Sequence, residues 1–169
     1  MYKKLFYIIL FLTTATQLAA QKTITKDVLV VSAGTGGTAA AIQAARLGVN
    51  TIIVESTTWL GGMISAAGVS ATDGNNKLPS GLWKEFRDQL YKVYGGPKAV
   101  ETGWVSNTLF EPHVADSIFK AMAAKEKKLT INYELEFEKA IVKNNKVIGA
   151  TFVNKKKETI TIFAKIIRN

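Results

Sequence analysis

The chain has 169 residues, of which 47% are hydrophobic, so it is long enough to bury a core and too apolar to stay disordered. It contains no cysteine, which excludes disulfides, iron–sulfur clusters and thiolate zinc sites. The formal net charge is +9, but lysines gather near predicted helix ends and turns, at 125, 127, 128 and 155–157, without interleaved aromatic residues. Such charge is typical of solvated surface, so we expect neither a metal site nor a nucleic-acid partner.

The first twenty residues have the composition of a secretory signal peptide. Lys3 and Lys4 form a basic start, Leu5 to Leu12 is an apolar run, and Leu18-Ala19-Ala20 offers a cleavage end. The apolar run is short for a membrane span, which favours cleavage over an uncleaved anchor. We therefore expect an exported protein, periplasmic or secreted, whose mature domain covers 21–169 and keeps no stable membrane anchor.

The segment from Asp27 to Glu55 predicts a strand–turn–helix–strand unit. Val28 to Val31 is an apolar, mostly β-branched run, typical of a strand buried on both faces. Thr38 to Leu47 is rich in alanine and predicts a helix. Thr51 to Val54 is a second apolar run, with an acidic residue at its tip. The order and length are those of a βαβ unit with parallel strands.

The turn inside this unit predicts nucleotide binding. The candidate contacts are Ser32, Gly34, Thr35, Gly36, Gly37 and Glu55. Glycines let the backbone approach a pyrophosphate, and a helix N-terminus offers free N–H groups and a partial positive charge. Glu55 follows Ser32 by 23 residues, a spacing suited to a ribose hydroxyl. The alternative is a turn that is rich in glycine only because it is tight.

Ser32 departs from the G-x-G-x-x-G fingerprint, which has glycine at this position. If the backbone there needs a positive φ, the Cβ of serine costs about 1 kcal/mol or more. The hydroxyl could instead bond a phosphate oxygen. The first interpretation is favoured, because the first glycine of the fingerprint serves the tight turn.

A long loop, Ser56 to Asp73, follows the second strand and carries the pair Gly61-Gly62. Such a loop either faces a ligand or lies free in solvent. Apolar residues are interleaved throughout it, which favours the ligand-facing interpretation.

Two amphipathic helices are expected after this loop. One begins at Pro79-Ser80 and runs to about Tyr94, where Gly95-Gly96-Pro97 stops it. The other opens at Glu111-Pro112-His113 and runs to about Lys128. The histidine, the only one in the chain, is either a proton-transfer group beside a cofactor or a residue that starts the helix. No second catalytic group accompanies it, which favours the second interpretation.

The C-terminal part predicts strands. Leu129 to Tyr133 is expected to join the parallel sheet, and Glu134 to Lys143, Val147 to Asn154 and Thr159 to Phe163 to form antiparallel hairpins. Ala164 to Ile167 is expected to be one more buried strand. The predicted class is α/β: a Rossmann-like FAD/NAD(P)-binding domain with a parallel sheet, flanking helices and a three-stranded antiparallel β-meander.

Four segments of the sequence resemble one family. They are DVLVVSAGTGGTAAAIQAARLG, VESTTWLGG, GLWKEFRD and FEPHVAD. Their wording is similar to that of the bacterial secreted FAD-dependent oxidoreductases, which have a glutathione-reductase-like FAD-binding fold and are related to heterodisulfide-reductase-like flavoproteins. The resemblance implies that FAD lies on Gly34 and Gly37, that Glu55 bonds its ribose, and that Gly61 and Gly62 lie near the pyrophosphate and flavin.

In such flavoproteins the last strand runs into an Asp-Ala-Thr-Gly-like segment and then a substrate domain. This sequence stops at Asn169, before that point. We therefore expect the N-terminal FAD-binding part of an oxidoreductase, acting on a small-molecule substrate, with the substrate domain absent and no turnover by this chain alone. The alternatives are an NAD(P)-binding dehydrogenase domain and a truncated, non-catalytic nucleotide-binding remnant. The glycine-bearing loop and the antiparallel segment argue against a simple NAD domain.

Overall fold

The computed structural model describes residues 22–75, 77–102 and 108–168. Its helices are α2 (Thr35–Arg46), α3 (Gly81–Tyr94) and α4 (Pro112–Ala123), with short 3₁₀ turns η2 (Gly62–Ile64) and η3 (Pro97–Val100). Its strands are β1 (Lys22–Val31), β2 (Thr51–Val54), β3 (Ala71–Thr72), β4 (Thr108–Leu109), β5 (Leu129–Asn132), β6 (Leu135–Lys143), β7 (Lys146–Asn154) and β8 (Thr159–Arg168).

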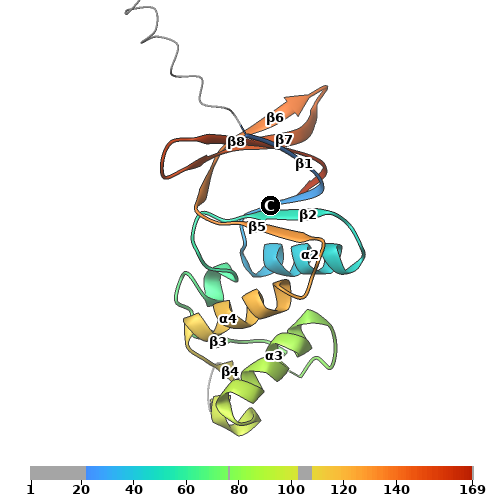
Figure 1. The fold of residues 1–169 in the computed structure, drawn as a ribbon. Helices are drawn as coiled ribbons and strands as arrows, with labels where there is room; N and C mark the ends of the chain where they lie inside the picture. The colour runs from blue at the N-terminus through green and yellow to red at the C-terminus, as the bar shows by residue number, and fades with distance from the viewer. Residues whose placement is uncertain (1–21, 76, 103–107, 169) are drawn as a thin grey trace, which may run out of the picture.

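The main sheet has six strands in the order β5-β2-β1-β8-β7-β6. The first four are parallel, and β7 runs antiparallel to both β8 and β6. Helix α2 lies against the parallel strands, with α4 and then α3 farther out on the same side, while β6 to β8 rise on the other (Figure 1). The predicted class, a Rossmann-like α/β sheet carrying an antiparallel meander, is confirmed.

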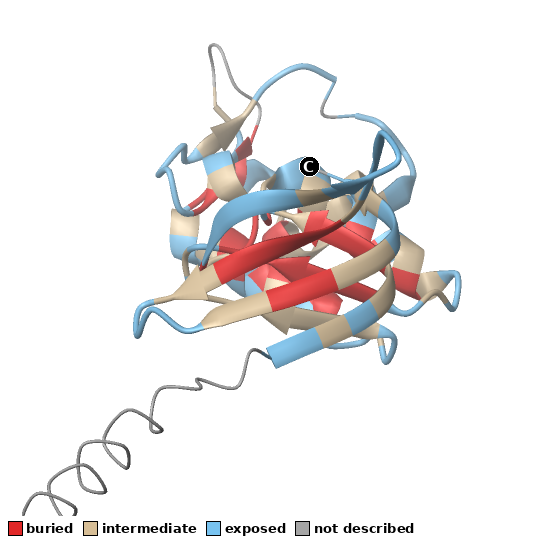
Figure 2. Ribbon diagram, turned by 90° about the horizontal axis from the view of Figure 1, so that it is seen from above, coloured by how far each residue is buried: buried red, intermediate tan, exposed pale blue. Residues whose placement is uncertain are grey.

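Both faces of the central strand β1 are covered, as its apolar run predicts. Val28 and Val30 pack with the helices, whereas Leu29 packs with Phe152 and Ile162 of the meander. Buried residues accordingly gather along the middle of the strands, and the turns between them are exposed (Figure 2).

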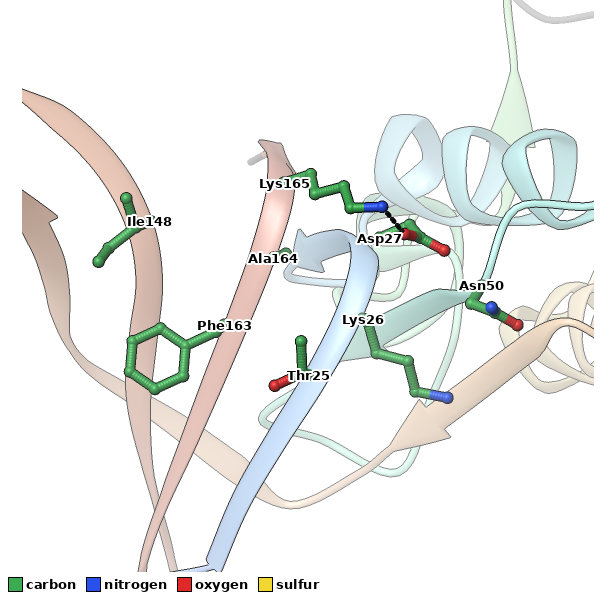
Figure 3. A pocket seen from close by; sticks show the side chains of 8 residues that line it. All are labelled: Thr25, Lys26, Asp27, Asn50, Ile148, Phe163, Ala164 and Lys165. Atoms are coloured by element: carbon green, nitrogen blue, oxygen red, sulfur yellow. Dashed lines mark ion pairs between the residues drawn. The ribbon is translucent and has the colours of Figure 1, made fainter.

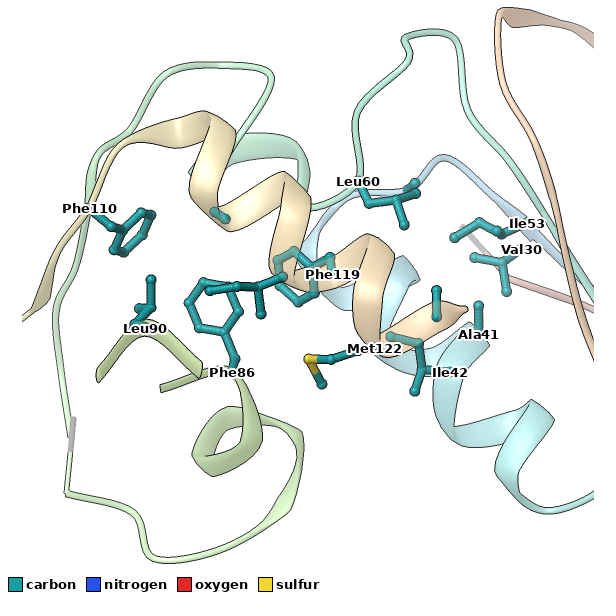
Figure 4. Close-up of a cluster of buried hydrophobic side chains, with 14 of the residues drawn as sticks. Val30, Ala41, Ile42, Ile53, Leu60, Phe86, Leu90, Phe110, Phe119 and Met122 are labelled. Atoms are coloured by element: carbon teal, nitrogen blue, oxygen red, sulfur yellow. The ribbon is translucent and has the colours of Figure 1, made fainter. Parts of the chain in front are cut away.

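The helix-side core centres on aromatic rings (Figure 4). The rings of Phe86 on α3 and Phe119 on α4 stack with centroids 4.8 Å apart, and Phe110 meets Phe86 edge-on at 5.8 Å. These contacts fix α3 on α4. Arg46 at the end of α2 adds a polar link, because its guanidinium donates to both carboxylate oxygens of Glu85 and also to Glu126. The hydrogen bonds from Arg46 lower the pKa of Glu85.

The last strand differs from the prediction in two ways. The segments 159–163 and 164–167 form one strand, β8, which pairs with β7 up to Phe163 and with β1 along its whole length. The expectation that Ala164 to Ile167 is buried is wrong, because Lys165 and Ile166 are exposed. Beyond Phe163 the strand has left β7, and Lys165 forms an ion pair with Asp27 at 2.7 Å beside an open hollow (Figure 3).

The remaining boundaries shift by smaller amounts. Strand β1 begins at Lys22 rather than Val28, because β8 continues to pair with it there. Helix α2 begins at Thr35 rather than Thr38, and α4 ends at Ala123 rather than near Lys128. The turn predicted at Asn144-Asn145 is confirmed, with positive φ at both residues. No helix in the described part of the chain is long and apolar enough to cross a membrane.

Candidate functional site

The site begins at the turn between β1 and α2. The N–H of Ser32 donates to the carbonyl of Val54 at 2.8 Å, which holds the turn against β2. Gly34 is the N-cap of α2, and its carbonyl accepts the N–H of Thr38 at 2.8 Å. The first N–H groups of a helix have no partner within it and carry a partial positive charge. The turn therefore presents donors suited to an anion at the carboxyl end of the parallel strands.

The glycines of this turn serve two different purposes. A Cβ on Gly37 would lie 2.3 Å from the carbonyl oxygen of Ser32, so this glycine is required for the helix to pack on the turn. A Cβ on Gly34 or Gly36 would meet nothing within 4 Å. A glycine inside a helix costs about 1 kcal/mol relative to alanine. Packing inside the chain does not explain Gly36, and the open space above it fits a ligand that approaches the backbone.

The second glycine pair lies directly on the first turn. The N–H of Gly61 donates to the carbonyl of Ala33 at 2.8 Å, and the hydroxyl of Thr35 donates to the carbonyl of Gly61 at 2.8 Å. A Cβ on Gly62 would lie 2.7 Å from the Cα of Gly34. Both loop glycines also have positive φ, +108° at Gly61 and +54° at Gly62. The structure thus brings together the two glycine segments that sequence analysis singled out separately.

Glu55 joins the tip of β2 to the same turn. Its carboxylate is buried, with Oε2 accepting the N–H of Ala33 at 2.7 Å and Oε1 accepting the N–H of Thr57 at 2.9 Å. A carboxylate has further lone pairs for a ligand hydroxyl. The position agrees with the predicted ribose contact, and the role of Glu55 toward a ligand stays a prediction.

Asp116 on α4 is a site residue that sequence analysis missed. Only 7% of it is exposed, and its Oδ1 accepts the N–H of Leu60 at 2.8 Å while Oδ2 accepts Lys120 Nζ at 2.7 Å. It therefore fixes the residue that precedes Gly61. A signal was present: Asp116 shares the helix face of Phe119, at a position where an exposed helix would not place a carboxylate among apolar residues.

Two other side chains complete the description. Tyr133 follows β5, and burial raises the pKa of its phenol, as do the negative charges of Asp116 and Glu55. His113 lies on the exposed side of the first turn of α4, where its carbonyl accepts the hydroxyl of Ser117 at 2.8 Å. That position favours the interpretation of His113 as a helix-start residue.

The loop from Ser56 to Asp73 does face a cavity. Its Met63, Ile64 and Val69 line a hollow of about 740 Å³ that also reaches Thr35 and Gly36 at the start of α2. The ligand-facing interpretation of the loop is therefore supported. Among the described residues, no group of three or more His, Cys, Asp or Glu side chains is placed to hold a metal ion.

A parallel sheet whose first βα turn is rich in glycine, with an acid at the tip of the second strand, defines a dinucleotide-binding domain. The particular family follows from the sequence: residues 27–167 match the model of the FAD dependent oxidoreductase family. The chain belongs to this family. FAD is accordingly its cofactor, and the alternative of an NAD(P)-dependent dehydrogenase is set aside. No curated protein matches the chain.

Solved structures share the fold. The myxobacterial FAD-dependent halogenase CndH is similar over 85% of this chain and 36% of its own, with 12% identity and a TM-score of 0.64. Sdh1 of Mycobacterium smegmatis in complex with UQ1 is 13% identical over 86% of this chain and 33% of its own (TM-score 0.60). A flavoprotein/dehydrogenase from Cytophaga hutchinsonii is 16% identical over 85% and 38% (TM-score 0.59). The chain spans less than half the length of each.

The residues present fit this cofactor. The open space at Gly34 and Gly36 leaves room for a pyrophosphate against the first turn of α2. Glu55 lies at the neighbouring strand end, where an adenosine ribose would follow.

The Ser32 backbone supports one of the two interpretations of this residue. Its φ is +75°, in the left-handed region that costs an L-residue about 1–2 kcal/mol. We predict that Ser32→Gly raises the free energy of unfolding by about 0.5–1 kcal/mol, since glycine removes the strain but adds flexibility to the unfolded chain. Denaturant titration followed by circular dichroism measures this change.

The control is Ser70→Gly, at an exposed serine without a positive φ, which should give no gain. An equal response of the two variants would show that Ser32 is not strained. An FAD titration of Ser32→Gly tests the other interpretation, because a hydroxyl that bonds phosphate would be missed as weaker binding.

Proposed function

We propose that this chain forms the FAD-binding part of an oxidoreductase that acts on a small organic molecule. The observation that carries the proposal is the backbone contact between the turn at Ala33–Thr35 and the pair Gly61-Gly62, which leaves the first turn of α2 open. Two turns that pack on each other through glycine, with donors directed to the same strand end, suit the pyrophosphate of a dinucleotide.

In this proposal each residue has a binding or orienting role. Gly34, Gly36 and the first N–H groups of α2 receive the pyrophosphate, and Glu55 bonds the adenosine ribose. Gly61 and Gly62 lie on the side of the pyrophosphate that leads to the flavin. Bound FAD supplies the redox chemistry, and the chain holds it in place. Asp116 and Thr35 act indirectly, by fixing Leu60 and Gly61.

We also propose that the protein is exported and is one of the bacterial secreted members of the family. The basic and apolar start of the sequence supports this, and those residues lie outside the part of the chain that the structure describes. The intact mass of the protein from a producing cell is expected to correspond to a chain that begins at Gln21. A mass that retains the first twenty residues would contradict cleavage.

The ribose role of Glu55 gives a direct test. We predict that Glu55→Gln weakens FAD binding about ten-fold or more, because a charge-assisted hydrogen bond contributes roughly 1.5–3 kcal/mol. The amide oxygen of glutamine can still accept the N–H of Ala33, so the turn should stay folded. A fluorescence titration with FAD measures the change.

The matched control is Glu136→Gln, the same substitution at an exposed position of β6. It should leave the FAD affinity unchanged. If Glu55→Gln also binds FAD as tightly as the parent protein does, the ribose assignment is wrong.

A further inference from the structure

A hollow with apolar walls lies beside the cofactor turn, and we call it the apolar hollow. Its volume is about 740 Å³, and its walls come from α2, η2, the loop that follows η2, β3, α3 and α4. Side chains that form it include Met63, Ile64, Leu78, Leu82 and Trp83. The stacked rings of Phe86 and Phe119 form its inner wall (Figure 4). Its volume falls within the range of small-molecule sites.

The apolar hollow leaves large hydrophobic side chains in contact with solvent. Met63 is 66% exposed, Leu78 is 50% exposed and Val69 is 42% exposed, and all three lie in its wall. Apolar groups gathered around one concavity mark binding sites more often than scattered ones do. An occupant that covers them would gain the free energy of removing apolar surface from water.

The charge of the wall restricts the occupant. Among the described residues that line the apolar hollow, Asp73 is the one ionisable side chain, and no lysine, arginine or histidine is present. A carboxylate or phosphate there would lose its hydration without gaining a partner, at considerable cost. The wall therefore selects against anions and favours a neutral molecule.

The apolar hollow is continuous with the cofactor turn. Thr35 and Gly36 belong to its wall, and they also form the first turn of α2, against which the pyrophosphate is placed. We propose that the apolar hollow binds the organic substrate, and that this substrate is a neutral, largely apolar molecule the size of a fused ring system. The proposal rests on the function proposed above, since it needs FAD on the adjoining turn.

The test uses Nile red, a neutral and apolar polycyclic dye, with the full chain. We expect a saturable increase in its fluorescence with one dye bound per protein, and no displacement when FAD is added. Leu78→Gln should weaken dye binding about ten-fold, because it places an amide in the apolar wall. Phe137→Gln is the matched control: Phe137 is 53% exposed on β6, away from the apolar hollow, and its loss should leave the dye affinity unchanged.

Three results would overturn the proposal. They are the lack of saturable dye binding, an equal effect of the two variants, and displacement of the dye by FAD, which would assign the apolar hollow to the flavin ring. An anionic dye, anilinonaphthalenesulfonate, should bind more weakly than Nile red, and tighter binding would contradict the neutral class. FAD affinity, measured separately by titration, tests the underlying function: failure to bind FAD would refute that function even if the dye binds as expected.

Discussion

The site depends on the approach of two backbone segments to hydrogen-bonding distance. Ala33 and Gly61 bond through main-chain groups, and the Cα of Gly34 lies where a side chain on Gly62 would have to be. Only glycine allows such contact between two turns with these φ values. Because side chains are excluded from the contact, the N–H groups at the start of α2 stay accessible from the strand end. The constraint explains why glycine occurs in both segments.

Side chains from elsewhere hold this contact in place. Glu55 fixes the first turn through Ala33, and Asp116 fixes the second through Leu60, so carboxylates from β2 and α4 act on opposite sides of the junction. Each bond joins a buried carboxylate to a backbone N–H, a type of hydrogen bond that contributes more than a neutral one. The packing of α3 on α4 then supports Asp116 from below, through the stacked rings of Phe86 and Phe119. In this way the hydrophobic core sets the geometry of a polar site.

Much of this could be predicted from sequence, because the signals are local. The apolar runs at 28–31 and 51–54 and the glycines between them specify one βαβ unit, and Ser32 marks strain at the position where the backbone turns. The missing features are tertiary. Strand β1 extends back to Lys22 only because β8 pairs with it, and Asp116 is buried only because Leu60 lies above it. The exposure of Lys165 likewise follows from where β7 ends.

The central claim is that Gly36 serves the ligand whereas Gly37 serves the fold, and an FAD titration of Gly36→Ala beside Gly37→Ala tests it most directly. Gly36→Ala should gain about 0.5–1 kcal/mol in the free energy of unfolding and lose at least about ten-fold in FAD affinity, since its methyl group enters the space kept for the pyrophosphate. Gly37→Ala should lose about 1–3 kcal/mol of stability, because its Cβ would meet Ser32. A stable Gly36→Ala protein that binds FAD as tightly as the parent would contradict the account.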